Sequence, residues 1–338
     1  MNISYVVPES PGNVALKTAE YDPQTLKPDE VLLKNEYSVI SAGTERAWII
    51  GQSNNPGQHF PFYPGYSASG YVAAAGSEVT NLKAGDRVLI TWGGHRSHTV
   101  RKADTVFKIT DDSIDLLDAA FAHIVSFPLL GIRRLRLEIG ESVMIAGQGI
   151  LGVIALQIAA LSGAVPLLVP DDQPSRRALA LKLGADLALN PADADFAEQV
   201  REATGGRGVN AVVEVTGVAA ALKQALKYVA REGRISLLGC TRVPDAAIDF
   251  YQDVHCPGVT LIGANTWNRP RFESRPGQWT EHDDYRTFLQ LLAVGKMQVR
   301  PLISEIVSPE KARDVYERLI TAKNPPLGIV FDWKQYSD

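Results

Sequence analysis

The sequence predicts an α/β protein in which a doubly wound parallel sheet is joined to an irregular β domain. Three observations support this prediction. A glycine-rich turn at 147–152 links an apolar strand to an apolar helix, apolar strands alternate with helices from about residue 119, and short strands separated by Gly and Pro turns fill residues 1–117. Strands that alternate with helices form parallel sheets whose two faces are both covered.

The irregular β domain is predicted from short apolar segments bounded by turn residues. These strands are expected at 30–34, 68–72 and 86–90. The tail contains a helix near 309–321 and a β-like segment at 328–332, and a terminal tail needs a partner sheet to be ordered. We therefore predict a first domain at 1–121, completed by 297–338, and a second domain at 122–296.

The second domain is predicted from six apolar strands with helices between them. The strands are expected at 143–146, 165–169, 187–189, 211–216, 234–239 and 259–263, and the helices near 153–161, 174–183, 219–230 and 283–294. This alternation predicts a parallel sheet with helices on both faces.

The turn at 147–152 reads G-x-G-x-x-G and predicts a dinucleotide site. Gly147 permits the tight turn, Gly149 lets backbone amides approach a pyrophosphate, and Gly152 lets the helix pack against the strand. The N-terminus of the following helix offers unpaired N–H groups to the phosphates. The alternative is a purely structural turn. The cofactor-binding candidates in this segment are Gly147, Gln148, Gly149, Ile150, Leu151 and Gly152.

Composition excludes several classes of function. The chain has 338 residues, a net charge of −4, 45% hydrophobic and 21% charged residues, which gives no electrostatic footprint for nucleic acid or an anionic membrane. No apolar run reaches the roughly 18 residues of a membrane span. Two cysteines make no disulfide framework, and the N-terminus shows no export signal. We expect a cytoplasmic protein with a small-molecule substrate.

Motifs in order along the chain resemble the medium-chain dehydrogenase/reductase superfamily, which contains zinc alcohol dehydrogenases and zinc-free quinone reductases. The motifs lie at 65–70, 84–88, 147–152, 182–186, 214–217 and 233–239. The resemblance implies a GroES-like β domain, a Rossmann domain and a substrate cleft between them. It also implies cofactor contacts at Thr216 and Gly239, and a homodimer or homotetramer.

The zinc ligands of the family are missing at two positions. Ala42 stands where zinc-dependent members have a Cys, and Tyr66 where they have a His, while His123 lies near the position of a third ligand. Ala supplies no ligand atom, and Tyr does not supply the imidazole that a catalytic zinc needs. The chain also lacks the four cysteines of a structural zinc lobe. We therefore predict no metal site.

The cofactor preference depends on the end of the second strand. The resemblance places Asp171 where an acid binds the ribose hydroxyls of NAD, and this carboxylate would repel a 2′-phosphate. Arg176, with Ser175 and Arg177 beside it, could accept such a phosphate instead. We predict NAD, with NADP as the alternative.

Without zinc, hydrogen-bond donors must stabilise charge on the substrate oxygen. The candidates are Thr44, Tyr66 and His123. Thr44 matches the proton-relay hydroxyl of the family, with a local turn hydrogen bond as the alternative. Tyr66 would donate from the place of a metal ligand, or only fill that space. His123 titrates in a range suited to acid–base work, or is a satisfied core histidine.

These observations predict a zinc-independent NAD(P)-dependent oxidoreductase that moves a hydride to or from a carbonyl, alcohol or activated double bond. One alternative is a polyol or secondary-alcohol dehydrogenase, and another is a non-catalytic nucleotide-binding protein. A long loop at 265–281 contains two tryptophans and three arginines. It is interpreted either as a substrate lid or as a subunit contact.

Overall fold

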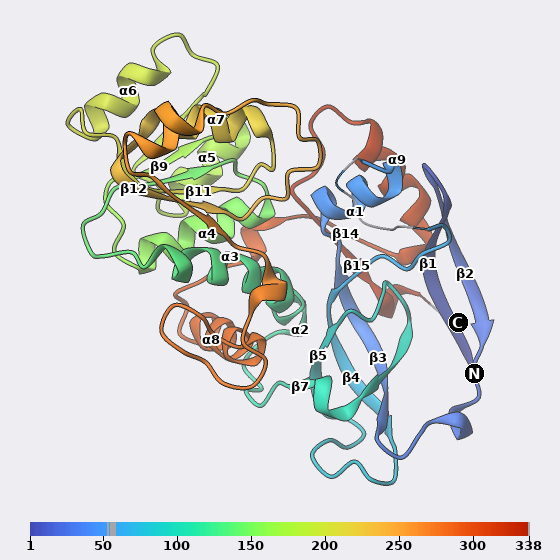
Figure 1. Cartoon of the computed structure of the whole chain (residues 1–338). Helices are drawn as coiled ribbons and strands as arrows, with labels where there is room; N and C mark the ends of the chain where they lie inside the picture. The colour runs from blue at the N-terminus through green and yellow to red at the C-terminus, as the bar shows by residue number, and fades with distance from the viewer. Residues whose placement is uncertain (53, 55–58, 337–338) are drawn as a thin grey trace. The chain divides into compact units, whose positions relative to one another are not determined.

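The chain divides into two units in the computed structural model, which describes residues 1–52, 54 and 59–336 (Figure 1). The first unit combines Met1–Ile124 with Phe288–Asp338, and the second is the continuous stretch Val125–Thr287. Each unit is described by itself below. The domain boundaries predicted at 121 and 297 stay a prediction.

The second unit contains a six-stranded parallel sheet. Its strands follow the order β10-β9-β8-β11-β12-β13, so the first strand along the chain, β8, lies between β9 and β11. The order reverses at β8, as in a doubly wound dinucleotide-binding sheet, and the predicted fold class is confirmed. The strand bounds are β8 (Val143–Ala146), β9 (Leu167–Pro170), β10 (Leu187–Leu189), β11 (Val209–Glu214), β12 (Val229–Leu237) and β13 (Thr260–Gly263).

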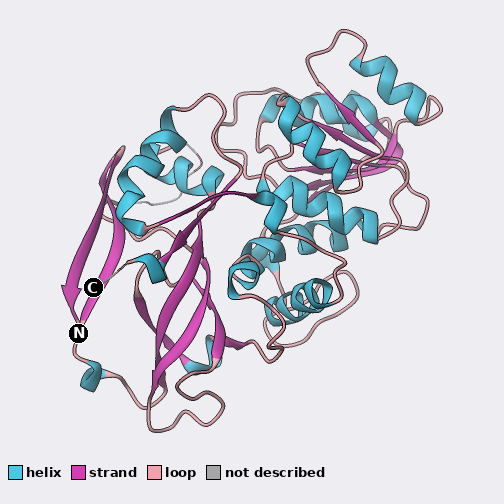
Figure 2. Cartoon of the chain, turned by 180° about the vertical axis from the view of Figure 1, so that it is seen from behind, coloured by secondary structure: helices cyan, strands magenta, loops and turns pink. Residues whose placement is uncertain are grey.

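Helices cover both faces of this sheet (Figure 2). Their bounds are α3 (Ala122–Leu135), α4 (Ile150–Leu161), α5 (Pro174–Lys182), α6 (Phe196–Ala203), α7 (Ala219–Tyr228) and α8 (Glu281–Ala293), of which α3 and α8 run across the unit boundaries. Helix α6 was not predicted from the sequence, because it has only 8 residues. It is held by the buried side chains of Phe196 and Val200, which share one helix face and join the core around Met144 and Ile235.

The first unit is built mainly on antiparallel strands, and only the pair β14–β15 among its described strands is parallel. A seven-stranded sheet follows the path β14-β15-β3-β4-β5-β7, with β6 also paired to β3, and β1 and β2 form a separate hairpin. The strand bounds are β1 (Asn2–Ser10), β2 (Asn13–Glu20), β3 (Glu30–Val39), β4 (Ser67–Ala75), β5 (Arg87–Thr91), β6 (His98–Lys102), β7 (Phe107–Lys108), β14 (Ile303–Val307) and β15 (Gly328–Asp332). The helix bounds are α1 (Ala42–Ile50), α2 (Leu116–Ala119) and α9 (Ala312–Thr321).

The C-terminal tail belongs to the first unit. Strand β15 is buried along its whole length and pairs antiparallel with β3, so that Val330 lies opposite Val39. Helix α9 packs against α1 and β2, and Tyr316 and Phe331 join one core cluster with Ile49. The tail therefore forms part of the hydrophobic core of the first unit.

Helix α1 was not predicted, because its first residues were compared only with the zinc-ligand positions of the family. It buries Glu45, Ala47 and Ile49 and ends at Gly51, whose φ of +66° favours glycine. No helix in the described ranges is long and apolar enough to cross a membrane.

Candidate active site

The glycine turn in the second unit has little room for side chains at two of its three glycines. Gly147 has a φ of +93°, and a Cβ there would lie 2.7 Å from Cγ2 of Thr216. A Cβ on Gly152 would lie 1.9 Å from the carbonyl oxygen of Gly147. Around Gly149, in contrast, an added Cβ meets nothing within 4 Å. The turn is closed toward the protein and open at Gly149, which is the arrangement that a pyrophosphate requires.

Helix α4 begins directly after this opening. Gly149 is its N-cap, no side chain caps it, and its first turn contains no acidic residue. The first N–H groups of a helix have no partner within the helix, and they carry a partial positive charge. The backbone amides of Ile150 and Leu151, both partly buried, belong to this first turn.

Asp171 lies beside the glycine turn, immediately after β9. One oxygen of its carboxylate accepts a hydrogen bond from the Gln148 amide at 2.7 Å, and the other accepts one from the Gln173 amide at 2.8 Å. A carboxylate can accept about four hydrogen bonds, so acceptor capacity remains for ribose hydroxyls. Two backbone amides thus hold the Asp171 carboxylate beside the glycine turn.

Three neighbours of Asp171 have distinct roles. The side chain of Gln148 is fully buried and donates to the carbonyls of Ile145 and Gly147 at 3.0 Å, so it braces the turn from inside. Arg177 donates to the carbonyl of Asp171 at 2.7 Å. Arg176 lies on the first turn of α5 and is partly exposed.

Glu214 is a site residue that sequence reasoning missed. It ends β11 and is buried, and burial raises the pKa of its carboxyl group. Its carboxylate accepts hydrogen bonds from the Thr216 hydroxyl, from the Thr216 amide at 2.8 Å and from the Gly217 amide at 3.2 Å. The sequence feature that could have indicated Glu214 is an acidic residue at the end of an apolar strand.

The carboxyl ends of four strands lie near this turn. The side chain of Thr216 lies next to Gly147, where an added Cβ would be 2.7 Å from its Cγ2. A Cβ on Gly239 would lie 2.4 Å from the Gly217 amide nitrogen. In open parallel sheets, ligands bind at the carboxyl ends of the strands near the reversal of strand order. The structure thus brings together the predicted residues at the ends of β8, β9, β11 and β12.

In the first unit, Tyr66 and His123 lie side by side. Their ring centroids are 5.4 Å apart in an edge-on arrangement, and both side chains are buried. The Tyr66 hydroxyl donates a hydrogen bond to Oγ of Ser41, the residue that precedes α1. Thr44 lies in the first turn of the same helix and is partly exposed. Two of the three catalytic candidates are therefore in contact.

Trp92 is a second residue that the sequence did not single out. Its ring centroid lies 5.2 Å from that of Tyr66 and 5.4 Å from that of His123, yet the residue is 49% exposed. Its φ of +55° is uncommon for a bulky residue, and such strain concentrates at functional sites. The signal in the sequence was an aromatic residue between a strand and two glycines.

The two positions at which the zinc ligands of the family are missing both lie in the first unit. Ala42 is the first residue of α1 and Tyr66 directly precedes β4. Across the residues that the structure describes, no group of three or more His, Cys, Asp or Glu side chains is arranged to hold a metal ion.

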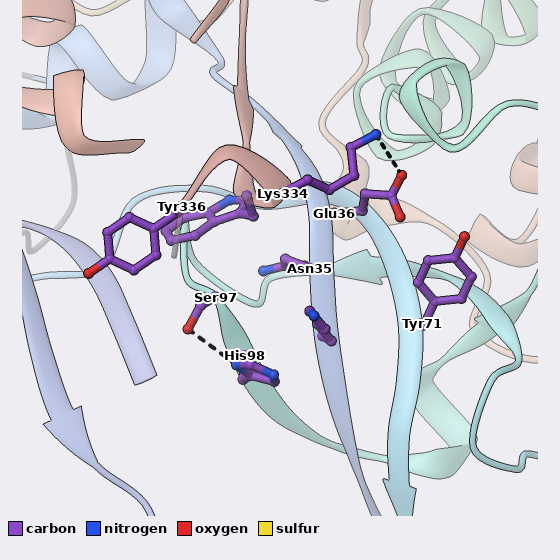
Figure 3. Close-up of a pocket in the computed structure, with 9 residues that line it drawn as sticks. Asn35, Glu36, Tyr71, Ser97, His98, Lys334 and Tyr336 are labelled. Atoms are coloured by element: carbon purple, nitrogen blue, oxygen red, sulfur yellow. Dashed lines mark hydrogen bonds and ion pairs between the residues drawn. The ribbon is translucent and has the colours of Figure 1, made fainter. Parts of the chain in front are cut away.

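A separate cavity of about 360 Å³ lies on the first unit (Figure 3). None of the catalytic candidates lines it. Lys334 reaches toward Glu36 at 3.1 Å, and Ser97 toward His98 at 3.2 Å. The full lining is Lys34, Asn35, Glu36, Tyr71, Ser97, His98, Trp333, Lys334 and Tyr336.

The loop at 265–281 is anchored within the second unit. Arg269 donates a hydrogen bond to the carbonyl of Ser126, and the Arg133 guanidinium lies 3.9 Å from the ring centroid of Trp279. Trp267 and Phe272 are 84% and 96% exposed. The loop is thus attached at its base and presents two aromatic side chains outward.

Comparisons with known proteins agree with this geometry. The family model described as "Alcohol dehydrogenase GroES-like domain" matches residues 27–127, and the one described as "Zinc-binding dehydrogenase" matches residues 151–281. The sorbitol dehydrogenase of Bacillus subtilis (strain 168) is 26% identical over 342 residues, covering 89% of this chain and 90% of the relative.

Two further matches cover different shares of the chain. The L-threonine 3-dehydrogenase of Pyrococcus furiosus is 34% identical over 178 residues, which is 53% of this chain and 47% of that protein. A proposed zinc-binding dehydrogenase from Sinorhizobium meliloti 1021, solved with bound NADP, has a TM-score of 0.83 at 22% identity, covering 98% of this chain and 99% of the other. With its two matched domains, its strand order and its glycine turn, the chain belongs to the medium-chain dehydrogenase/reductase superfamily and is an NAD(P)-dependent, alcohol dehydrogenase-like oxidoreductase.

Proposed function

We propose that this oxidoreductase works without zinc and uses side-chain donors on its substrate oxygen. The observation that carries the proposal is the state of Tyr66. It occupies a ligand position of the zinc enzymes, but its hydroxyl donates to Ser41 and its ring packs against His123 and Trp92. Ala42 at the other ligand position offers no ligand atom. One remaining position near His123 does not hold a metal ion.

The chemistry then divides between cofactor and protein. The nicotinamide carries the hydride, and the protein stabilises charge that develops on the substrate oxygen. A well-placed hydrogen-bond donor contributes about 2.7–4 kcal/mol to that stabilisation. Tyr66 and His123, which lie together, are the proposed donors, and Thr44 is the proposed relay hydroxyl. The Tyr66 hydroxyl has a single proton, so in the substrate complex Ser41 would donate to the Tyr66 oxygen and free that proton for the substrate.

Metal analysis tests the zinc-free proposal directly. Protein purified without chelator is expected to contain far less than one zinc per chain, and its turnover is expected to survive dialysis against a chelator. Stoichiometric zinc, together with activity that a chelator abolishes and zinc restores, would contradict the proposal.

We also propose NAD as the preferred cofactor. The support is Asp171, whose carboxylate is fixed by two backbone amides beside the glycine turn. A negative charge there repels a 2′-phosphate. Initial rates with NADH and NADPH test this preference. Asp171→Ser should reduce the preference for NADH, whereas the exposed neighbour change Asp172→Ser should not. A tenfold preference of the unaltered enzyme for NADPH would refute the assignment.

The proposed substrates are activated acceptors such as enones, quinones or keto-sugars, because no metal polarises the carbonyl. The half-exposed indole of Trp92 supports a planar or ring-shaped substrate, since flat apolar faces stack on indole. A polyol or secondary-alcohol dehydrogenase is the second candidate, favoured by the similarity to sorbitol dehydrogenase. A panel of acceptors and polyols separates these two. Cofactor binding without turnover on either set would favour a non-catalytic nucleotide-binding protein.

We propose a homodimer or homotetramer, and a subunit contact as the role of the loop at 265–281. The support is the exposure of Trp267 and Phe272 on a loop whose base is anchored. Light scattering of the enzyme and of Trp267→Ser/Phe272→Ser gives the oligomeric state. A lid would instead leave the mass unchanged and raise the KM of the substrate.

A further inference from the structure

The first unit contains a buried carboxylate that is linked to Tyr66 through Ser41. Glu45 lies in α1 and has no exposed surface. Its carboxylate accepts hydrogen bonds from the Ser41 amide at 2.9 Å and from the Tyr316 hydroxyl, and it lies 3.2 Å from Nε2 of His95. An isolated buried carboxylate costs several kcal/mol. The three groups therefore hold Glu45 in one orientation.

His95 is itself held from its other side. It is fully buried, its Nδ1 lies 2.8 Å from Oγ of Ser38, and Nε1 of Trp333 donates to the same oxygen at 2.9 Å. The Ser38 hydroxyl can thus accept from Trp333 and donate to Nδ1 of His95, which leaves the Nε2 proton for Glu45. In this tautomer every group of the cluster has a suitable partner.

The connection from Glu45 to Tyr66 runs through Ser41. Glu45 binds Ser41 twice, because its carboxylate accepts from the Ser41 amide and its own amide donates to the Ser41 carbonyl at 2.9 Å. Ser41 in turn accepts the hydrogen bond of the Tyr66 hydroxyl. The backbone of Ser41 is therefore fixed on both of its polar groups, and its side chain fixes the phenol.

We propose that Glu45, supported by His95 and Tyr316, is a positioning residue that sets the Tyr66 hydroxyl for catalysis. The inference rests on the proposed function of Tyr66 as donor to the substrate oxygen. Glu45 does not touch the substrate in this scheme. It acts only by orienting Ser41, because a displacement of about 1 Å at a catalytic group can lower the rate roughly 100-fold.

A double-mutant cycle tests the inference, with NADH and 9,10-phenanthrenequinone as the probe pair. Glu45→Gln keeps the shape of the side chain but replaces one acceptor oxygen by a donor. We expect it to lower kcat roughly 10- to 100-fold, with the KM for NADH unchanged. In a Tyr66→Phe background the same change should have no further effect on kcat, since its target is gone. Tyr63→Phe, at a half-exposed tyrosine outside this cluster, is the control and should keep the full rate.

The outcomes separate the two claims. If Tyr66→Phe lowers kcat and the effect of Glu45→Gln is additive to it or absent, the positioning role is refuted while the function proposed for Tyr66 stands. If Tyr66→Phe leaves kcat unchanged, that function is wrong and the inference falls with it.

A structural measurement keeps the inference testable without turnover. In a crystal structure of Glu45→Gln, the hydrogen bond from Tyr66 to Ser41 should be lost or lengthened. Glu45→Asp serves the same purpose if the glutamine variant does not fold, since the shorter carboxylate cannot keep all three partners. An unchanged Tyr66–Ser41 bond in the variant obtained would overturn the proposal.

Discussion

At the scale of single residues, one position differs from the pattern of the zinc-dependent members of the family. Tyr66 is the example: a phenol replaces an imidazole, and its partner changes from a metal to the hydroxyl of Ser41. The replacement was visible in the sequence, but the partner was not. Ser41 is 25 residues away along the chain, and only the fold of β4 against the start of α1 brings the two hydroxyls together.

Removal of the Tyr66 hydroxyl is the first test at this scale. Tyr66→Phe keeps the ring contacts with Trp92 and His123 and deletes only the donor, so kcat should fall by about 100- to 1,000-fold. Steady-state kinetics with NADH would show this fall at an unchanged KM for the cofactor. Tyr63→Phe, at a half-exposed tyrosine that stacks on Arg96, should retain the full rate.

At the scale of elements, the glycine turn has one glycine packed against the backbone and one that faces open space. Gly152 is needed for the packing of α4 on the turn, while Gly149 faces open space. The G-x-G-x-x-G pattern predicted both roles from the sequence, because they follow from spacing between a strand and a helix. What the pattern could not supply is the support from Asp171, which accepts a hydrogen bond from Gln148 after the neighbouring strand β8.

Two alanine substitutions should therefore behave differently. Gly152→Ala places a Cβ 1.9 Å from the Gly147 carbonyl, so the unfolding midpoint should drop. Gly149→Ala has room for its methyl group and should fold normally, but it should bind NADH roughly tenfold more weakly, a loss of about 1.4 kcal/mol. Thermal unfolding and fluorescence titration measure the two effects. Equal unfolding midpoints for both variants would contradict this assignment.

Helix α8 carries a pH-sensitive group. Asp284 is buried beside Arg133 and Arg269, and burial raises the pKa of its carboxyl group to about 6. Between the unfolded pKa near 4 and this value, the folded state holds a proton that the unfolded state lacks. The corresponding stability is present below pH 4 and is lost as the pH rises through 6.

Urea unfolding at two pH values measures this loss. Between pH 4.5 and 7.5, the unaltered chain should lose about 2 kcal/mol more of its unfolding free energy than Asp284→Asn does. The pKa of Asp283 is instead lowered by hydrogen bonds from Ser274 and Thr280. Asp283→Asn should therefore leave the pH dependence unchanged in this range. Identical curves for all three proteins would refute the raised pKa.

At the scale of the whole molecule, the sequence predicted the architecture better than the site. The parallel sheet with helices on both faces follows from periodicity and from the family motifs. The cluster around Glu45 could not be predicted, because its members come from positions 38, 41, 95, 316 and 333, which no local pattern links. The contacts of Trp92 likewise depend on a backbone conformation that a bulky residue rarely adopts.

Truncation of the tail tests how far the first unit depends on it. Deleting residues 323–338 removes β15 with Phe331, which is fully buried, and Trp333. We expect residues of the first unit to become sensitive to protease while a fragment near 125–287 stays resistant. Mass spectrometry of the digest identifies the surviving fragment. Deleting only residues 337–338 is the control, and a resistant first unit in the longer truncation would contradict the expectation.

The order of the two units along the chain also determines which unit can fold first during synthesis. The second unit is one continuous stretch, whereas the first needs both ends of the polypeptide. Domains fold as units while the ribosome proceeds from the N-terminus. The nucleotide-binding unit can thus fold while Tyr66, already translated, still waits for Tyr316 and β15. The nascent chain therefore completes its glycine turn before the hydrogen bonds around Glu45 that support Tyr66. Under the proposed function, an incomplete chain should bind a dinucleotide without catalysing hydride transfer.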